Sequence, residues 1–449
     1  MSVVNMVPVA VSAASALAFA AYLLPWGRRP ATCTADGFAR DLEQAPVVLR
    51  PAILSFGSPA HSQQMFSLLK LGNPETGFPS VEWWDYSRHG LTVDLLMGAG
   101  QTLSDWASED VRSRMADHIG VDQVTVSSPA RGWVRLELRV HDTLAEAVVT
   151  DVQTGNVTAA GVDLESVPVG VREDGTPWLL RILYSHILIA GATGSGKGSV
   201  LWSILLGLGP AIKAGFVDVW LIDPKGGVEF GVGEDKLFVR FATDAPTVIA
   251  TLTEAVKVME QRQARMRAAG LRKLVPSKDE PLILLIIDEA AALSSYAERD
   301  QQEEFRRQTG KLQSQGRAVG VSVIAAVQDP SKEVMPNRQL FPTRIGLRLE
   351  EPTQIAMIHG KGARDKGALC DEIPEETPGV GYVGEDGKKG FVRVRAYWIT
   401  DEQTKEIVDR FSPAADVDFA PAEDYSDFDP DDLGDDDIPG DGYSGPVAA

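Results

Sequence analysis

The sequence predicts an α/β fold built on a mainly parallel β-sheet, and two features between residues 185 and 412 carry this prediction. Short runs that are apolar throughout alternate with segments of helical length, which is typical of a parallel sheet covered by helices on both faces. These runs are HILIAG, FVDVWLID, LILLIID, VSVIAAV and RIGLRL. A glycine-rich loop also follows the first run and precedes a helical segment, an order that favours a phosphate-binding sheet.

The composition is that of a globular protein with an unusual acidic end. The 449 residues are 44% hydrophobic and 24% charged, which suits two or three domains. The two cysteines lie far apart and the six histidines are scattered, so neither a disulfide framework nor a metal cluster is indicated. The net charge is −20, but residues 413–449 hold twelve acids and no Lys or Arg. This segment predicts a disordered tail that either solubilises the protein or binds a protein partner or mimics DNA.

The N-terminal 30 residues predict a single transmembrane anchor. Residues 7–25 carry no charge and are long enough for a helix that nearly spans a hydrocarbon core of about 30 Å. No Lys or Arg precedes this run, whereas Arg28 and Arg29 follow it, which argues against a secretory signal peptide. By the positive-inside rule, everything after Gly27 would then lie in the cytoplasm of a single-pass protein of the cell membrane. A core or interfacial helix is the alternative.

Between the anchor and the glycine loop, the pattern indicates smaller units. Residues 31–88 show no clear period and are interpreted as a linker or small subdomain. Residues 89–165 predict a small α/β domain, in which GWVRLELRV alternates as a half-buried strand does. Residues 166–412 then form the larger α/β domain, and Asp174-Gly175 predicts a hairpin turn near its start.

The glycine loop predicts a nucleotide site. HILIAG, ATGSGKG and SVLWSILLGLG read as strand, loop and helix, which is the context that makes a phosphate-loop match specific. Backbone N–H groups of the loop would surround a phosphate, and the Lys197 ammonium would contact the β- and γ-phosphates of ATP. The predicted nucleotide-binding residues are Gly191, Ala192, Thr193, Gly194, Ser195, Gly196, Lys197, Gly198 and Ser199.

Two later strand ends supply the chemistry that ATP hydrolysis requires. LILLIID ends in Asp288, a predicted Mg²⁺ ligand, and Glu289, which would deprotonate the attacking water. A helix cap is the simpler interpretation of such an acid pair taken alone. Gln328 ends the next apolar run and would contact the γ-phosphate or the water; in isolation it would be a turn residue.

With these motifs in place, residues 167–383 resemble the motor domain of the FtsK/SpoIIIE family of DNA translocases. The resemblance rests on VPVGVREDGTPW, the glycine loop, LIDPKGG, LILLIIDEAAAL, GRAVGVSVIAAVQDPS and FPTRIGLRL, in the family's order. Residues 91–140 resemble, less specifically, the small domain that precedes that motor. The layout, with GKGARDKGALCDEIP, is most similar to transfer proteins of actinobacterial conjugative plasmids and integrative elements.

The resemblance implies a RecA-like P-loop ATPase that forms a homo-hexameric ring and moves double-stranded DNA through it with ATP and Mg²⁺. In such a ring an arginine from the neighbouring subunit would stabilise the transferring phosphoryl group. The candidates are Arg344, Arg348 and Arg317. A basic cluster on one helix and its end (Arg262, Arg265, Arg267, Arg272 and Lys273) and Lys225 could face DNA, although a solvated or inter-subunit face is the simpler interpretation.

Two alternatives stay open at the level of sequence. A type VII secretion motor shares the loop and acid motifs, but usually has several ATPase domains where this chain has one phosphate loop. A non-hydrolysing nucleotide-binding scaffold is suggested by Gly198, because Ser or Thr normally stands there to hold Mg²⁺. We expect the metal to be held by phosphates, water and Asp288, and Gly198→Ser to leave activity intact or raise it. Many members of the family end in a winged-helix module that reads a DNA sequence, whereas here the motor pattern gives way at about Ser412 to the acidic segment. We therefore expect any sequence specificity to come from elsewhere or from a partner.

Overall fold

The computed structural model describes residues 42–87, 90–152, 163–295, 297–385, 387 and 390–413. The predicted membrane segment at residues 7–25 and nearly all of the predicted acidic tail lie outside these residues. Within them, no helix is both long enough and apolar enough to cross a bilayer.

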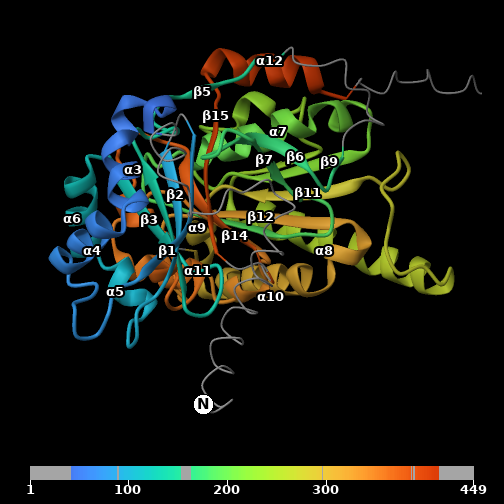
Figure 1. The fold of residues 1–449 in the computed structure, drawn as a ribbon. Coiled ribbons are helices and arrows are strands. Elements are labelled where there is room, and N and C mark those ends of the chain that lie inside the picture. The colour runs from blue at the N-terminus through green and yellow to red at the C-terminus, as the bar shows by residue number, and fades with distance from the viewer. Residues whose placement is uncertain are drawn as a thin grey trace, which may run out of the picture. The chain divides into compact units, whose positions relative to one another are not determined.

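The first part of the described chain is a small domain in which four helices pack on an antiparallel sheet of strand order β1-β2-β4-β3 (Figure 1). Its elements are η3 (Val47–Leu49), α3 (Arg50–Gly57), α4 (Pro59–Leu68), β1 (Ser80–Ser87), β2 (Gly90–Leu96), α5 (Leu103–Ala107), α6 (Glu109–Ile119), β3 (Gln123–Ser127) and β4 (Trp133–Arg139). One hydrophobic core contains Leu49, Phe66, Trp106 and Leu136. The boundary expected between residues 88 and 89 therefore falls inside a β-hairpin, because β1 pairs with β2.

The larger domain is an α/β structure with a mixed, mostly parallel sheet. Its strands are β5 (Val148–Val149), β6 (Val167–Arg172), β7 (Pro177–Leu180), β8 (Ile187–Ala190), β9 (Val217–Ile222), β10 (Arg240–Ala242), β11 (Leu282–Ile287), β12 (Val321–Val327), β13 (Thr343–Gly346), β14 (Val380–Glu385) and β15 (Val392–Trp398). The main path runs β10-β9-β11-β12-β8-β13-β14-β15-β6-β7, with β5 beside β15. Neighbours are parallel from β10 to β13 and antiparallel from β13 to β7. The five apolar runs and the hairpin at Asp174-Gly175 are confirmed as strands and turn.

Helices cover both faces of this sheet. They are α7 (Lys197–Lys213), η5 (Gly231–Gly233), α8 (Ala245–Ala268), α9 (Ala290–Ser294), α10 (Arg299–Gln315), η6 (Arg317–Val319), η7 (Arg338–Leu340), α11 (Pro352–His359), η8 (Arg364–Lys366), η9 (Cys370–Glu372) and α12 (Asp401–Phe411). Figure 1 shows α7 and α12 on one side of the strands, with α8 and α10 on the other. A hydrophobic core lies on each face of the sheet, and strand β8 contributes to both. Ile187 and Ile189 pack on the α7 side, and Leu188 and Ala190 pack on the α8 side.

This topology decides where the polar strand ends meet. Strands β9, β11, β12, β8 and β13 run in the same direction, so the residues that follow each of them lie at one edge of the sheet. Every residue of β8, β11 and β12 is buried, as expected for strands of a parallel sheet that is covered on both faces. The predicted site residues therefore share this carboxyl edge.

Candidate nucleotide site

The glycine loop joins β8 to α7 and is tied to the strands on either side of β8. The Gly191 N–H donates to the Val327 carbonyl at 3.1 Å, and the Ala192 N–H donates to the Arg348 carbonyl at 2.8 Å. Two glycines of the loop, Gly194 and Gly196, have φ of 74° and 94°, a region that glycine adopts without steric cost. A Cβ on Gly196 would also lie 2.8 Å from the Gly379 Cα. The loop is thus held in one shape before any phosphate arrives.

Lys197 is the first residue of α7, and its side chain folds back over the loop. Its Nζ donates to the carbonyls of Gly191 and Ala192, at 2.8 and 3.1 Å. Burial lowers the pKa of Lys197, although Glu289 and Asp288 favour its charged form. Anionic phosphate oxygens accept stronger hydrogen bonds from an ammonium than neutral carbonyls do, so a phosphate in the loop would take over these two contacts.

Asp288 and Glu289 follow β11, as predicted, and both are buried. The Asp288 backbone N–H donates to the Ile222 carbonyl at 3.0 Å, which places its side chain beside the end of β9. Its Oδ2 accepts a hydrogen bond from Lys225 Nζ at 2.9 Å. Glu289 caps α9, because its Oε1 accepts from the Ala291 N–H at 3.4 Å.

The cap is compatible with the catalytic role predicted for Glu289, because the cap uses only one carboxylate oxygen. Among the described residues, the buried Oε2 of Glu289 has no hydrogen-bond partner. Burial raises the pKa of Glu289, against the opposing charges of Lys225 and Lys197. A raised pKa brings a carboxylate closer to the basicity that a general base needs near neutral pH.

Sequence reasoning missed two residues that the structure brings into this site. Lys225 appeared there only as a possible DNA contact, yet it pairs with Asp288, and Asp223 received no role. Asp223 follows β9 and is fully buried, with its Oδ1 accepting from the Lys225 N–H at 3.1 Å. Burial disfavours the charged form of Lys225, but the hydrogen bond and charge of Asp288 outweigh it and raise its pKa. The signal was present in LIDPKGG, which ends a strand next to the acid-bearing one.

Glu229 is a third residue without a sequence-based role. Burial of its carboxyl group, together with the charge of Asp288, raises the pKa of Glu229 to about 6. Asp223 acts in the same direction, whereas Lys225 and Lys197 oppose it. Glu229 therefore belongs to the same electrostatic cluster as the predicted acids.

The cluster suits a divalent cation that arrives with a nucleotide. Four carboxylates (Asp223, Glu229, Asp288 and Glu289) face two ammonium groups (Lys197 and Lys225). Within the described ranges, Asp223 Oδ2 and Asp288 Oδ1 are buried without a hydrogen-bond partner, and Mg²⁺ prefers such oxygen ligands. No three His, Cys, Asp or Glu side chains of the described chain are grouped to hold a metal alone. The donor set fits Mg²⁺ completed by phosphate oxygens and water.

Gln328 and Arg348 also lie at the loop. The Thr193 hydroxyl donates to the side-chain oxygen of Gln328 at 3.3 Å. Arg348 follows β13, and its guanidinium donates to the Thr193 carbonyl at 2.9 Å and pairs with Glu375 at 3.3 Å. Arg348 therefore contacts the phosphate loop of its own chain.

The other two arginine candidates lie elsewhere. Arg344 is inside β13, where it donates to the carbonyls of Phe341 and Ile358 at 3.0 and 3.4 Å. Arg317 is exposed in η6, which precedes β12 and so lies at the edge opposite the loop. The structure does not bring Arg344 or Arg317 to the nucleotide site of the same chain.

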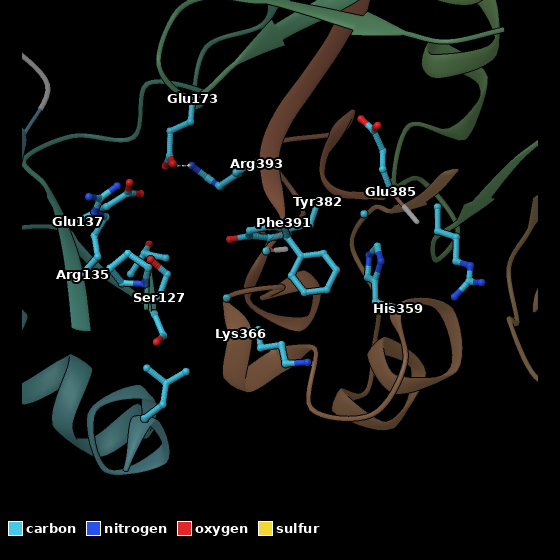
Figure 2. Close-up of a pocket in the computed structure, with 18 of the residues that line it drawn as sticks. Ser127, Arg135, Glu137, Glu173, His359, Lys366, Tyr382, Glu385, Phe391 and Arg393 are labelled. Atoms are coloured by element: carbon cyan, nitrogen blue, oxygen red, sulfur yellow. Dashed lines mark hydrogen bonds and ion pairs between the residues drawn. The ribbon is translucent and has the colours of Figure 1, made fainter. Parts of the chain in front are cut away.

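Arg344 instead lines a separate cavity of about 830 Å³ between strands β3 and β4 and strands β14 and β15. Figure 2 shows Arg135 and Glu137 on one side of this cavity and His359, Phe391 and Arg393 on the other. No residue of the phosphate loop lines it. This cavity is thus distinct from the nucleotide site.

The basic cluster on α8 is partly structural. Arg262 is buried, and its guanidinium donates to the carbonyls of Val319, Gly320 and Pro281 at 2.7 to 3.2 Å. Arg265 pairs with Glu280. Arg262 therefore stabilises the segment before β12, and its side chain is too buried to contact DNA.

Comparison with known proteins confirms the resemblance. Residues 142–280 match the model of the FtsK/SpoIIIE family, a range that overlaps the part of the chain that carries the predicted resemblance. The DNA translocase FtsK of Mycobacterium leprae is 28% identical over 326 residues, which cover 66% of this chain and 37% of that protein. FtsK of Tropheryma whipplei is 25% identical over 324 residues, which cover 67% of this chain and 42% of that protein. The chain thus spans about two fifths of the length of these relatives.

Among solved structures, the pCW3 conjugation coupling protein TcpA with ATPγS has the same fold. It aligns with a TM-score of 0.53 at 19% identity, over 78% of this chain and 98% of that one. At this identity the likeness concerns the fold alone. It agrees with the α/β fold of the larger domain.

Proposed function

We propose that this protein is an ATPase that moves double-stranded DNA. The observation that carries the proposal is the meeting of Lys197, Asp288, Glu289 and Gln328 at one sheet edge, in a chain that matches the model of the FtsK/SpoIIIE family. The relatives that match the chain are named as DNA translocases, which favours duplex DNA over protein as the cargo.

The chain's own groups divide the work of hydrolysis. The loop N–H groups and Lys197 bind and orient the β- and γ-phosphates, and Lys197 leaves its carbonyl partners to do so. Asp288 and the phosphates would hold Mg²⁺, which neutralises charge that builds up during phosphoryl transfer. Glu289 takes a proton from the attacking water through its unpartnered oxygen. Gln328, whose side-chain oxygen accepts a hydrogen bond from the Thr193 hydroxyl, would contact the γ-phosphate and respond to its loss.

We further propose a homo-hexameric ring in which DNA passes through the centre. The contact of Arg348 with its own loop supports a role within the subunit, where it steadies the loop and the γ-phosphate. Arg344 and the exposed Arg317 stay candidates for action in trans, across a subunit interface. An arginine finger is worth roughly 10³–10⁵ in rate, so the residue that acts in trans dominates turnover.

The cellular setting is proposed on narrower grounds. The uncharged segment at residues 7–25 supports anchorage in the cell membrane with the ATPase in the cytoplasm. The resemblance to transfer proteins supports a role in conjugative transfer of a mobile element. The acidic residues after 413 would solubilise the chain or bind a protein partner.

The test is the rate of ATP hydrolysis by the full-length protein with and without linear duplex DNA. We expect duplex DNA to raise the rate several-fold, since phosphate contacts in the ring should favour the assembled, active state. The stimulation should weaken steeply with salt, because Lys and Arg contacts to DNA release counterions. Hydrolysis that ignores DNA would favour the protein-secreting motor, and nucleotide binding without hydrolysis would favour the scaffold.

A further inference from the structure

Gly198 is the position of the phosphate loop where a hydroxyl normally helps to hold Mg²⁺. Ser199 is no simple substitute, because one residue along a helix turns the side chain by about 100°. The chain has therefore lost the usual protein ligand at the N-terminus of α7. Another group would have to occupy this metal-ligand position.

The space beside Gly198 is taken by the carboxylate of Glu229. A Cβ built on Gly198 would overlap Glu229 Oε1 and lie 2.8 Å from its Cδ. The Oε1 atom lies about one covalent bond length from that Cβ position, so it occupies space that the side chain of a serine at 198 would fill. Glycine at 198 and glutamate at 229 are thus sterically complementary.

The packing of the next residue along the chain holds Glu229 there. Phe230 is fully buried and stacks on Trp202, with ring centroids 5.3 Å apart and an interplanar angle of 18°. Trp202 is four residues after Gly198, so both lie on the same face of α7. The Gly231 N–H closes the turn by donating to the Gly227 carbonyl at 2.8 Å. Two consecutive residues of the loop after β9 therefore meet two positions on one face of α7.

The charges around Glu229 are those of the metal-binding region. Asp288, Asp223, Lys225 and Lys197 all act electrostatically on its carboxyl group. Glu229 also keeps exposed surface, so a nucleotide entering the loop could reach it. A carboxylate is a stronger ligand for Mg²⁺ than a neutral hydroxyl, because its negative charge adds to the attraction for the dication.

We propose that the Glu229 carboxylate is a protein ligand of Mg²⁺ in this site, where it takes the place of the hydroxyl that Gly198 lacks. This inference rests on the proposed nucleotide site and deepens it. It also explains how a phosphate loop with glycine at this position supports hydrolysis. It requires only that Oε1 remain beside the N-terminus of α7 when the phosphates bind.

The test compares metal binding by full-length wild type, Glu229→Ala, Gly198→Ser and the double variant. Free Mn²⁺ is followed by its EPR signal in the presence of a non-hydrolysable ATP analogue. We expect Glu229→Ala to weaken Mn²⁺ binding by about tenfold or more, as loss of a metal-site group does. Binding of a fluorescent ATP analogue in EDTA should stay unchanged, which shows that the variant is folded.

The double variant is the decisive arm. Serine at 198 supplies a hydroxyl oxygen in place of the carboxylate that Glu229→Ala removes, so Gly198→Ser in the Glu229→Ala background should restore Mn²⁺ affinity to within about threefold of wild type. Gly198→Ser alone should also bind Mn²⁺ normally, because the flexible carboxylate can move aside for the hydroxyl. The matched control, Glu234→Ala, removes an exposed acid from the same segment and should change nothing.

Two results would overturn the proposal: wild-type Mn²⁺ affinity in Glu229→Ala, or a double variant as weak as Glu229→Ala. Because no DNA is present, the outcome is independent of DNA-dependent turnover. If Glu229→Ala bound Mn²⁺ with wild-type affinity while DNA stimulated ATP hydrolysis, Glu229 would not be a metal ligand but the translocase proposal would stand. If Gly198→Ser restored Mn²⁺ affinity in the Glu229→Ala background but DNA did not stimulate ATP hydrolysis, the metal-ligand proposal would stand and the translocase proposal would fail.

Discussion

Lys197→Ala should bind ATP roughly 100-fold more weakly than wild type and should hydrolyse it far more slowly. The ammonium is positioned over the loop by two carbonyls, and a phosphate would replace both contacts. Loss of charge-assisted hydrogen bonds worth about 3 kcal/mol corresponds to a roughly 100-fold weaker affinity. Equilibrium titration with a fluorescent ATP analogue measures this directly.

The matched control is Lys213→Ala, at the other end of the same helix. Lys213 donates to the Arg410 carbonyl at 2.8 Å and is outside the nucleotide site. This variant should bind ATP as wild type does. If Lys197→Ala bound ATP with the same affinity as wild type, Lys197 would not contact the β- and γ-phosphates.

Glu289→Gln should separate binding from chemistry. Glutamine keeps the side-chain oxygen that caps α9 and the volume of the buried group, but it cannot accept the proton of water. We expect nucleotide affinity within about twofold of wild type and a rate of hydrolysis lower by roughly 10²–10⁴, the usual contribution of a general base. Phosphate release measured at saturating ATP provides the rate.

Glu280→Gln is the control for that substitution. Glu280 precedes β11, at the end of the strand opposite Glu289, and pairs with the exposed Arg265. Its hydrolysis should match wild type. If Glu289→Gln hydrolysed ATP as fast as this control, Glu289 would be a helix cap and nothing more.

The parallel sheet and the phosphate loop were predictable because their signals are local. The strands β8, β11 and β12 are buried on both faces, so each reads as an unbroken apolar run. The loop and the acid pair each follow such a run directly. Parallel neighbours then bring them together at one edge, whatever the distance between them in the sequence.

The small domain was harder to read, and β1 shows why. A register shift between Val81 and Trp83 interrupts its pairing with β2. As a result Trp83 and Trp84 are both buried, although adjacent strand residues normally face opposite sides. The alternation that marks a strand is lost, so the segment was interpreted only as part of a linker or small subdomain.

The remaining site residues depend on contacts that no local pattern encodes. Lys225 meets Asp288 only because β9 lies next to β11 in the sheet. Glu229 meets Gly198 only because the loop after β9 folds back on α7 through Phe230 and Trp202. An unusual residue within a motif, such as Gly198, was the one sequence feature that pointed to such a compensation.

Movement along DNA is the central claim, and displacement of a third strand from duplex DNA tests it most directly. The full-length protein, ATP and Mg²⁺ are added to a linear duplex that carries a labelled triplex-forming strand. We expect release of that strand with wild-type protein and ATP, and none with Lys197→Ala or a non-hydrolysable analogue. If ATP is hydrolysed while the third strand stays bound, the protein does not translocate on DNA.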